Sequence, residues 1–173
     1  MPDSSAQPAT DAPAVDPLAL RKALGQFATG VCIVASPPVA DEAQPFAITV
    51  NSFASVSLDP PMVLWSMQKD STTYALWLET QQFGISVLAA DQAALCDQFA
   101  VRGNHAITDA ESFTLSDNGS PLMFGAVATF DCRVNAIHDA GDHKIIVADV
   151  LAFASDASRE PLIYVRGGVH GSS

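Results

Sequence analysis

The residues from Thr49 to Ser57 are the strongest candidates for chemistry in this sequence. They read Thr-Val-Asn-Ser-Phe-Ala-Ser-Val-Ser, so hydroxyl groups and one amide follow each other closely, and Pro60-Pro61 comes soon afterwards. Apolar and small polar residues alternate up to Ser52, which predicts a strand that runs into a polar segment. Hydroxyls and exposed backbone N–H groups suit a phosphate or the polar edge of a heterocycle. A Ser/Thr-rich strand and turn without a ligand explains the same spacing equally well.

A second candidate is the segment Lys69-Asp-Ser-Thr-Thr73, which precedes a predicted helix that begins at Tyr74. Lys69 is the only basic residue between Lys22 and Arg102. Free N–H groups at a helix start, together with a cation and hydroxyls, form an anion site. An exposed lysine beside an ordinary helix cap is the alternative. Combined with the hydroxyl-rich segment that precedes it, the pattern favours a bound phosphate.

The third candidate is Gly141-Asp-His143, in the turn between two predicted strands. Gly and Asp tolerate the backbone conformations of such turns. The turn does not explain His143, which is either an ordinary exposed residue or a contact to a nicotinamide ligand. A metal ion held by His138 and His143 is a weaker alternative, because the four histidines of the chain lack the spacing of zinc ligands. We therefore expect no metal.

Apolar periodicity and turn residues predict about seven strands and three short helices. Asp16 followed by Pro17 is a typical helix start, and Asp91 is expected to cap a later helix. The expected helices are residues 17–27, 74–80 and 91–101. The expected strands are residues 31–35, 45–57, 62–67, 83–88, 126–137, 144–154 and 161–166, with an irregular segment at 102–124. Strands at this spacing favour an antiparallel barrel or sandwich.

Composition limits the organisation and the partners of the chain. With 173 residues, 49% of them hydrophobic, it can build one domain with a core, which we place at residues 17–173. Residues 1–16 contain almost no bulky apolar side chains, so we expect a disordered tail. A net charge of −11 argues against a nucleic-acid partner, and no apolar run is long enough to span a membrane. We therefore expect a cytoplasmic protein.

The three cysteines, Cys32, Cys96 and Cys132, are odd in number, widely spaced and set among apolar neighbours. This pattern predicts buried reduced thiols rather than disulfides or metal ligands. The sequence also lacks the glycine fingerprints of Rossmann and P-loop proteins. A dinucleotide, if bound, is therefore held in another way.

With these residues in view, the chain resembles the short-chain flavin reductase family, the reductase components of two-component flavin-dependent monooxygenases. The resemblance runs from about Leu20 to Gly168. Its marks are Phe27-Ala-Thr-Gly-Val31, the segment Thr49 to Pro61, Lys69 to Thr72, Phe99-Ala100, Gly141-Asp-His143 and Pro161-Leu-Ile-Tyr164. Each is weak alone, but all six occur in order.

The resemblance implies an FMN-binding split barrel, which is a Greek-key antiparallel β-barrel with a few short helices. It implies a homodimer with flavin near the interface. It also implies hydride transfer from NADH or NADPH to FMN or FAD, and delivery of the reduced flavin to a separate oxygenase component. A split barrel that holds flavin for electron relay, without turnover, is the alternative.

The resemblance also assigns roles to individual residues. Those along the isoalloxazine ring are Thr49, Val50, Asn51 and Ser52. Those at the ribityl phosphate end are Ser55, Ser57, Lys69, Ser71 and Thr72. His143 is implied to contact the nicotinamide, and Tyr164 and Arg166 lie in the strand that closes the pocket. Because the flavin carries the chemistry, we expect no indispensable acid or base from the protein.

Overall fold

The computed structural model describes residues 15–39 and 42–171. The expected disordered tail at residues 1–16 falls almost wholly outside the described residues. Asp16 is described, and its side chain caps the first helix as expected, with Oδ1 accepting a hydrogen bond of 2.9 Å from the N–H of Leu18. Within the part of the chain that is described, no helix is long and apolar enough to cross a lipid bilayer.

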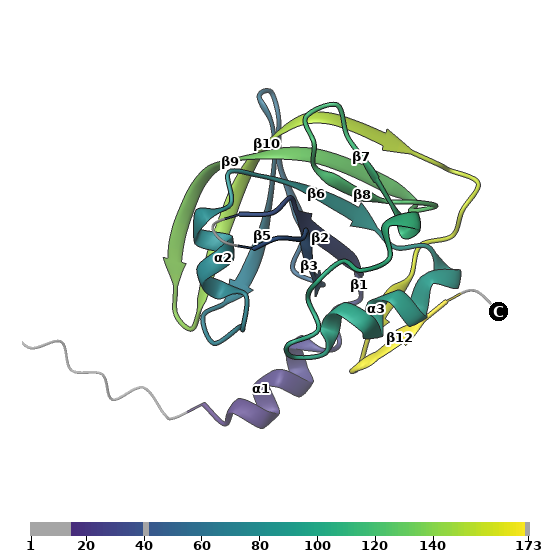
Figure 1. The fold of residues 1–173 in the computed structure, drawn as a ribbon. Helices are drawn as coiled ribbons and strands as arrows, with labels where there is room; N and C mark the ends of the chain where they lie inside the picture. The colour runs from purple at the N-terminus through teal and green to yellow at the C-terminus, as the bar shows by residue number, and fades with distance from the viewer. Residues whose placement is uncertain (1–14, 40–41, 172–173) are drawn as a thin grey trace, which may run out of the picture.

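Seven strands form one antiparallel sheet in the order β3-β2-β6-β9-β10-β5-β4 (Figure 1). The strands are β2 (Cys32–Ser36), β3 (Phe46–Val50), β4 (Ala54–Leu58), β5 (Pro61–Gln68), β6 (Gln82–Val87), β9 (Ala128–Ala140) and β10 (His143–Ser155). Its two edge strands, β3 and β4, are consecutive in the chain, and only residues 51–53 join them. Four extended residue steps span at most about 14 Å, so the sheet must curve until its edges approach each other. The predicted mainly β barrel is confirmed.

The remaining elements are short and lie around this barrel. The helices are α1 (Pro17–Leu24), α2 (Tyr74–Glu79) and α3 (Ala93–Ala100), with two 3₁₀ turns at Ala90–Gln92 and Ala110–Ser112. Three strands form a small sheet in the order β1-β11-β12: β1 (Thr29–Gly30), β11 (Ile163–Val165) and β12 (Gly168–His170). A separate hairpin pairs β7 (Phe113–Leu115) with β8 (Pro121–Met123). In Figure 1, β9 and β10 curve over the top and α1 projects from the bottom.

Aromatic side chains fill the interior of the barrel. Side chains of β5 alternate between buried and less buried positions, which places Trp65 and Met67 inside with no exposed surface. Trp65 packs edge-on against Trp77 of α2 at 4.9 Å between ring centroids, and Trp77 packs on Phe46 at the same distance. Such edge-to-face pairs add to the large area that aromatic rings bury. Helix α2 is therefore fixed to the end of β5 by core packing.

Several expected boundaries differ from the structure. The first helix ends at Leu24 rather than near residue 27, because Gly25 caps it and its N–H binds the carbonyls of the last turn. Asp91 does not cap a helix, so that expectation was wrong. The side chain of Gln92 accepts the hydrogen bond from the N–H of Ala89 instead, and Asp91 forms an ion pair with Arg159 at 2.6 Å.

The C-terminal half of the chain shows two further differences. The expected strand at 161–166 covers only Ile163–Val165, because Arg166 takes a left-handed backbone conformation with φ of 53° and begins a turn to β12. The segment expected to be irregular, residues 102–124, contains the β7–β8 hairpin. The ring of Phe113 in this hairpin packs on Phe99 of α3. Tertiary packing, rather than local pattern, makes these strands.

The three cysteines are buried and free, as predicted. Burial disfavours the thiolate and raises the pKa of Cys32 and of Cys132 to about 12, and it also raises the pKa of Cys96. The thiols therefore behave as small apolar side chains of the core, with little nucleophilic character near neutral pH.

Gly84 of β6 offers a test of this packing. A Cβ atom at this position would collide with the backbone carbonyl oxygen of Pro121, whereas one at Gly30 would meet nothing within 4 Å. We expect Gly84→Ala to lower the free energy of unfolding by about 2 kcal/mol or more, since backbone must move to admit the methyl group. Gly30→Ala is the control, with a change of about 0.5 kcal/mol or less. Equal urea midpoints for the two variants would contradict the close contact of β6 with β8.

Candidate functional site

The C-terminal ends of β5 and α3 enclose a cavity of about 280 Å³, called here the β5–α3 cavity. Three of the predicted site residues line it: Thr49 from β3, and Ser71 and Thr72 from the loop between β5 and α2. Gln68, Phe99 and Ala100 also line it. The structure thus brings together one part of the hydroxyl-rich segment with the hydroxyls that follow Lys69.

Arg102 also lines this cavity, and the sequence analysis did not assign it a role. Its Nη2 donates to the carbonyl of Asp70 at 2.9 Å, and its Nη1 lies 3.8 Å from the Asp70 carboxylate, although the side chain is largely exposed. The guanidinium therefore provides a positive charge at the rim beside Ser71 and Thr72. Its position two residues after the Phe99-Ala100 motif was the signal that could have identified it.

His105 contributes a further polar atom to the cavity. Its Nδ1 is buried, and the described residues provide no hydrogen-bond partner for it. A buried polar atom without a partner is costly unless a ligand or water satisfies it. The hydroxyls, the guanidinium and this ring nitrogen together suit a phosphorylated ligand, because each can bond to phosphate or ribityl oxygens.

The first half of the hydroxyl-rich segment holds the barrel together. The hydroxyl of Thr49 donates to the carbonyl of Cys96 in α3 at 2.8 Å. The Ser52 hydroxyl accepts from the N–H of Ser66 at 2.9 Å and donates to its carbonyl at 3.1 Å, so it joins the 51–53 link to β5. Val50 is 8% exposed and packs in the core. These contacts hold the end of β3 and the 51–53 link against α3 and β5.

The second half of the segment lies on β4, away from the β5–α3 cavity. Ser55 pairs with Val63 and Ser57 with Met62, near the start of β5, whereas Ser71 follows its far end. Met62 and Gln68 are six residue steps apart, which is about 20 Å along the strand. Within one chain, Ser55 and Ser57 are therefore not brought together with Ser71 and Thr72.

Asn51, Tyr164 and Arg166 line two adjoining grooves beside α1, called here the α1 groove, with volumes of about 640 and 500 Å³. Arg166 is anchored there, because its N–H bonds to the carbonyl of Gly25 at 2.7 Å and its Nε to Gln26 at 3.0 Å. Arg21 also lines both grooves. Three predicted site residues thus line the β5–α3 cavity, and three others line the α1 groove.

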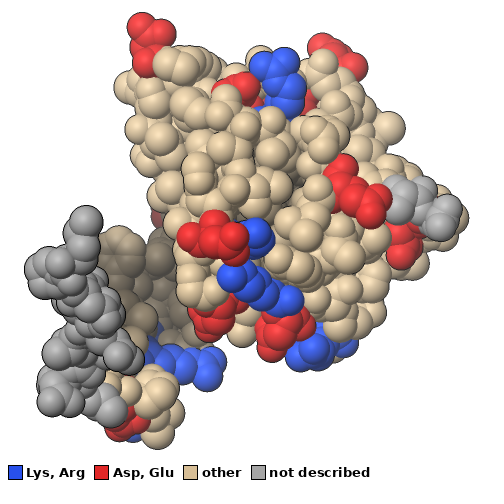
Figure 2. Space-filling model, turned by 90° about the vertical axis from the view of Figure 1, so that its left-hand side faces the viewer, with Lys and Arg blue, Asp and Glu red and all other residues tan. Residues whose placement is uncertain are grey.

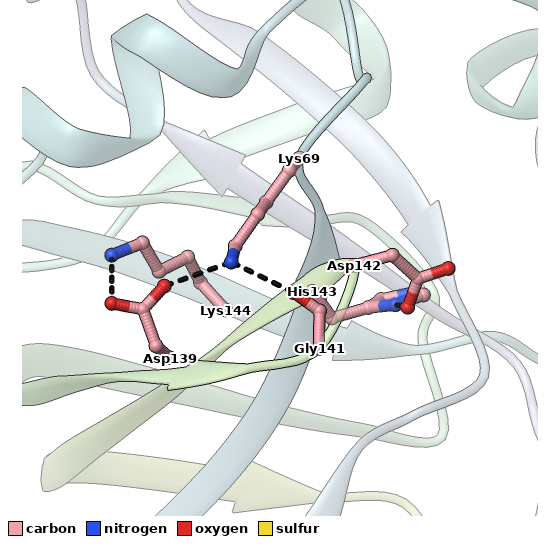
Figure 3. Close-up of polar contacts among 6 residues, drawn as sticks. All are labelled: Lys69, Asp139, Gly141, Asp142, His143 and Lys144. Atoms are coloured by element: carbon pink, nitrogen blue, oxygen red, sulfur yellow. Dashed lines mark hydrogen bonds and ion pairs between the residues drawn. The ribbon is translucent and has the colours of Figure 1, made fainter.

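Lys69 points away from the β5–α3 cavity, toward the turn between β9 and β10 (Figure 3). Its Nζ donates to the carbonyl of Gly141 at 2.7 Å and lies 2.9 Å from the Asp139 carboxylate. His143, the first residue of β10, pairs in register with Gln68, which lines the cavity. The Gly141-Asp-His143 turn therefore lies one strand away from the cavity wall.

Acidic and basic side chains neutralise one another on this side of the molecule. Figure 2 shows the face on the left of Figure 1, where a group of basic and acidic side chains lies in contact near the middle of a mostly uncharged surface. Hydrogen bonds from Lys69 and Lys144 hold the pKa of Asp139 below its ordinary value. The hydrogen bond from His143 likewise lowers the pKa of Asp142. Over the described residues, no three His, Cys, Asp or Glu side chains gather as metal ligands would.

The family model for the flavin reductase like domain matches residues 24–173. The chain is 46% identical over 152 residues to the FMN reductase (NADH) SmoA of Agrobacterium fabrum, covering 87% of this chain and 83% of the relative. It is 34% identical over 163 residues to the reductase subunit HsaB of a flavin-dependent monooxygenase of Rhodococcus jostii, covering 94% and 82%.

Solved structures give the same result. The NADH:FAD oxidoreductase SgcE6 of Streptomyces globisporus, in complex with NAD and FAD fragments, superimposes with a TM-score of 0.83 at 32% identity, covering 94% of this chain and 98% of that one. Fold and site together define a split-barrel protein of the flavin reductase type. The chain belongs to the flavin reductase like domain family.

Proposed function

We propose that this protein transfers a hydride from NADH or NADPH to FMN or FAD and supplies the reduced flavin to a separate monooxygenase. One observation carries the proposal. The hydroxyl-lined β5–α3 cavity, with Arg102 at its rim, is separated by one strand pairing from His143. Relatives named as an FMN reductase (NADH) and as a monooxygenase reductase subunit support the reaction and the partner.

In this proposal the β5–α3 cavity receives the phosphate end of the flavin. Ser71 and Thr72 donate hydroxyl hydrogen bonds, and the Arg102 guanidinium supplies the opposite charge that the acidic chain otherwise lacks there. The ring would lie along Thr49, Val50 and the 51–53 link. Ser55 and Ser57, on β4, would meet the flavin only at the far end of that wall or from a second copy of the chain.

The flavin and the nicotinamide supply the chemistry, which is hydride transfer from nicotinamide C4 to flavin N5. The protein orients the two rings and excludes water between them. His143 orients the nicotinamide through its Nε2, because its Nδ1 is bound to Asp142 at 2.7 Å. Tyr164 and Arg166 close the opposite side from the α1 groove. A protein that only stores flavin would not need the His143 contact, and the names of the relatives favour turnover over electron relay.

We also propose that the protein is a homodimer. Large apolar side chains are exposed on β4 and β10, with Leu58 at 93% and Phe153 at 75% exposure, and β4 is an edge strand of the main sheet. Helix α1 buries none of its side chains in a single chain. An apolar face and an open edge of this kind are typical of surfaces that a second copy covers. Light scattering after gel filtration should give twice the mass of the chain, and the mass of a single chain would refute the dimer.

His143→Ala tests the nicotinamide contact. We expect it to raise the KM for NADH and to lower kcat/KM by a factor that corresponds to about 1–3 kcal/mol, because a positioning hydrogen bond is lost. The KM for FMN should stay near that of the wild type. His138→Ala is the matched control, since His138 is exposed on the same hairpin. Unchanged steady-state kinetics of His143→Ala would remove His143 from the site.

Arg102→Met tests the phosphate end. We expect the Kd for FMN to rise about 10- to 100-fold, because a hydrogen bond between charged groups contributes about 1.5–3 kcal/mol. The Kd for riboflavin, which lacks the phosphate, should change little. Arg133→Met serves as the control, because Arg133 is an exposed cation paired with Asp149 on the hairpin. Equal losses for FMN and riboflavin would place the phosphate elsewhere.

The deciding experiment for the function is an NADH oxidation assay of the purified protein with and without added free FMN. A flavin reductase should consume NADH in proportion to added flavin and continue over many turnovers. Stoichiometric yellow flavin on the protein, without NADH consumption, would instead establish the electron-relay alternative. The same assay with NADPH and with FAD assigns the preferred pair of substrates.

A further inference from the structure

Lys69 makes two hydrogen bonds to the Gly141-Asp-His143 turn. Its backbone N–H donates to the carbonyl of Asp142 at 2.9 Å, and its Nζ donates to the carbonyl of Gly141 at 2.7 Å. The two carbonyls are consecutive, so Lys69, the residue directly after β5, binds both of them (Figure 3). Without the Lys69 side chain, the Gly141 carbonyl would accept a hydrogen bond from water instead.

The turn itself is tight. Ala140 and His143 are register partners, so only Gly141 and Asp142 lie between the two strands. Gly141 has φ of 62°, and its place as the first central residue with positive φ is typical of a type II′ turn. His143 is the first residue after it, so any tilt of the turn would move the imidazole directly.

Asp139 completes the contact from the other strand. One carboxylate oxygen lies 2.9 Å from Lys69 and the other 3.1 Å from Lys144, which is the register partner of Asp139. The hydrogen bonds from Lys69 and Lys144 lower the pKa of Asp139. The hydrogen bond to Asp139 raises the pKa of Lys69. Each shift favours the charged form of its group, so Asp139 and Lys69 are both charged near neutral pH. The cluster ties β5, β10 and β9 together at their ends.

The orientation of His143 follows from the same turn. The hydrogen bond from His143 lowers the pKa of the Asp142 carboxyl group, and an ionised carboxylate only accepts hydrogen bonds. His143 Nδ1 therefore carries the hydrogen in the 2.7 Å contact, and Nε2 is left for a ligand. Lys69 holds the backbone carbonyl of Asp142, the residue whose carboxylate orients the imidazole.

We propose that Lys69 is a positioning residue for the nicotinamide nucleotide, acting through the Gly141–His143 turn rather than as a ligand of the flavin phosphate. The proposal rests on the proposed function of His143. It differs from the sequence-based expectation because Lys69 does not line the β5–α3 cavity and its Nζ is engaged by Gly141 and Asp139. Exposed ion pairs add little to stability, so the effect belongs to substrate binding rather than to folding.

The test compares Lys69→Met, Lys69→Arg and His143→Ala, with Arg133→Met as the control for loss of a paired surface cation. We expect Lys69→Met to raise the KM for NADH at least about threefold, with the KM for FMN and the melting temperature close to wild type. Lys69→Arg keeps the charge opposite Asp139 and should restore part of the loss. The double variant Lys69→Met/His143→Ala should have the same KM for NADH as His143→Ala alone, because both changes remove the same contact to the nicotinamide nucleotide.

Each outcome separates the positioning role from the proposed function. A rise in the KM for FMN with an unchanged KM for NADH would show that Lys69 binds the flavin phosphate, and it would overturn the proposal. Full additivity of the double variant would also overturn it. If His143→Ala itself leaves the KM for NADH unchanged, the nicotinamide role of His143 fails. If His143→Ala raises that KM while Lys69→Met does not, only the positioning role fails.

Discussion

The short link between the two edge strands of the main sheet is the constraint on which the rest of the structure depends. Residues 51–53 connect β3 to β4, so the seven-stranded sheet has to close on itself. Closure gives the barrel an interior that Trp65 and Trp77 fill, and it brings the Ser52 hydroxyl onto the backbone of β5. The same closure sets β3, β5 and α3 around one cavity. The hydroxyl-rich segment thus helps to close the barrel, and its residue Thr49 also lines the cavity.

The register between β5 and β10 sets where His143 lies relative to the β5–α3 cavity. The pairing of β10 with β5 sets His143 opposite Gln68, so the turn that bears the imidazole follows the end of the cavity wall. Lys69, the residue that directly follows β5, binds that turn through its backbone and its side chain. The cavity wall and the turn that bears His143 therefore meet at the end of β5. A displacement of β5 would disturb both.

The sequence predicted most of the architecture because its signals are local. Asp16 before Pro17 marks a helix start whatever the rest of the chain does, and alternation along β5 follows from one face being buried. Prediction failed where the partner is distant in the sequence. Asp91 pairs with Arg159 instead of capping a helix, and nothing near residue 91 reveals that partner. The segment 102–124 acquires strands only because Phe113 packs on another element.

The candidate site was likewise predictable where the signal is local and not where it depends on distant partners. Motif positions gave its residues, but they did not say which hollow each residue lines, because that depends on pairing across the barrel. The structure of the protein with FMN bound is the most direct measurement of the arrangement. The account predicts that the phosphate lies within hydrogen-bond distance of Ser71 or Thr72 and of Arg102, with Lys69 still paired to Asp139. A phosphate bound by Lys69, or held in the α1 groove, would contradict it.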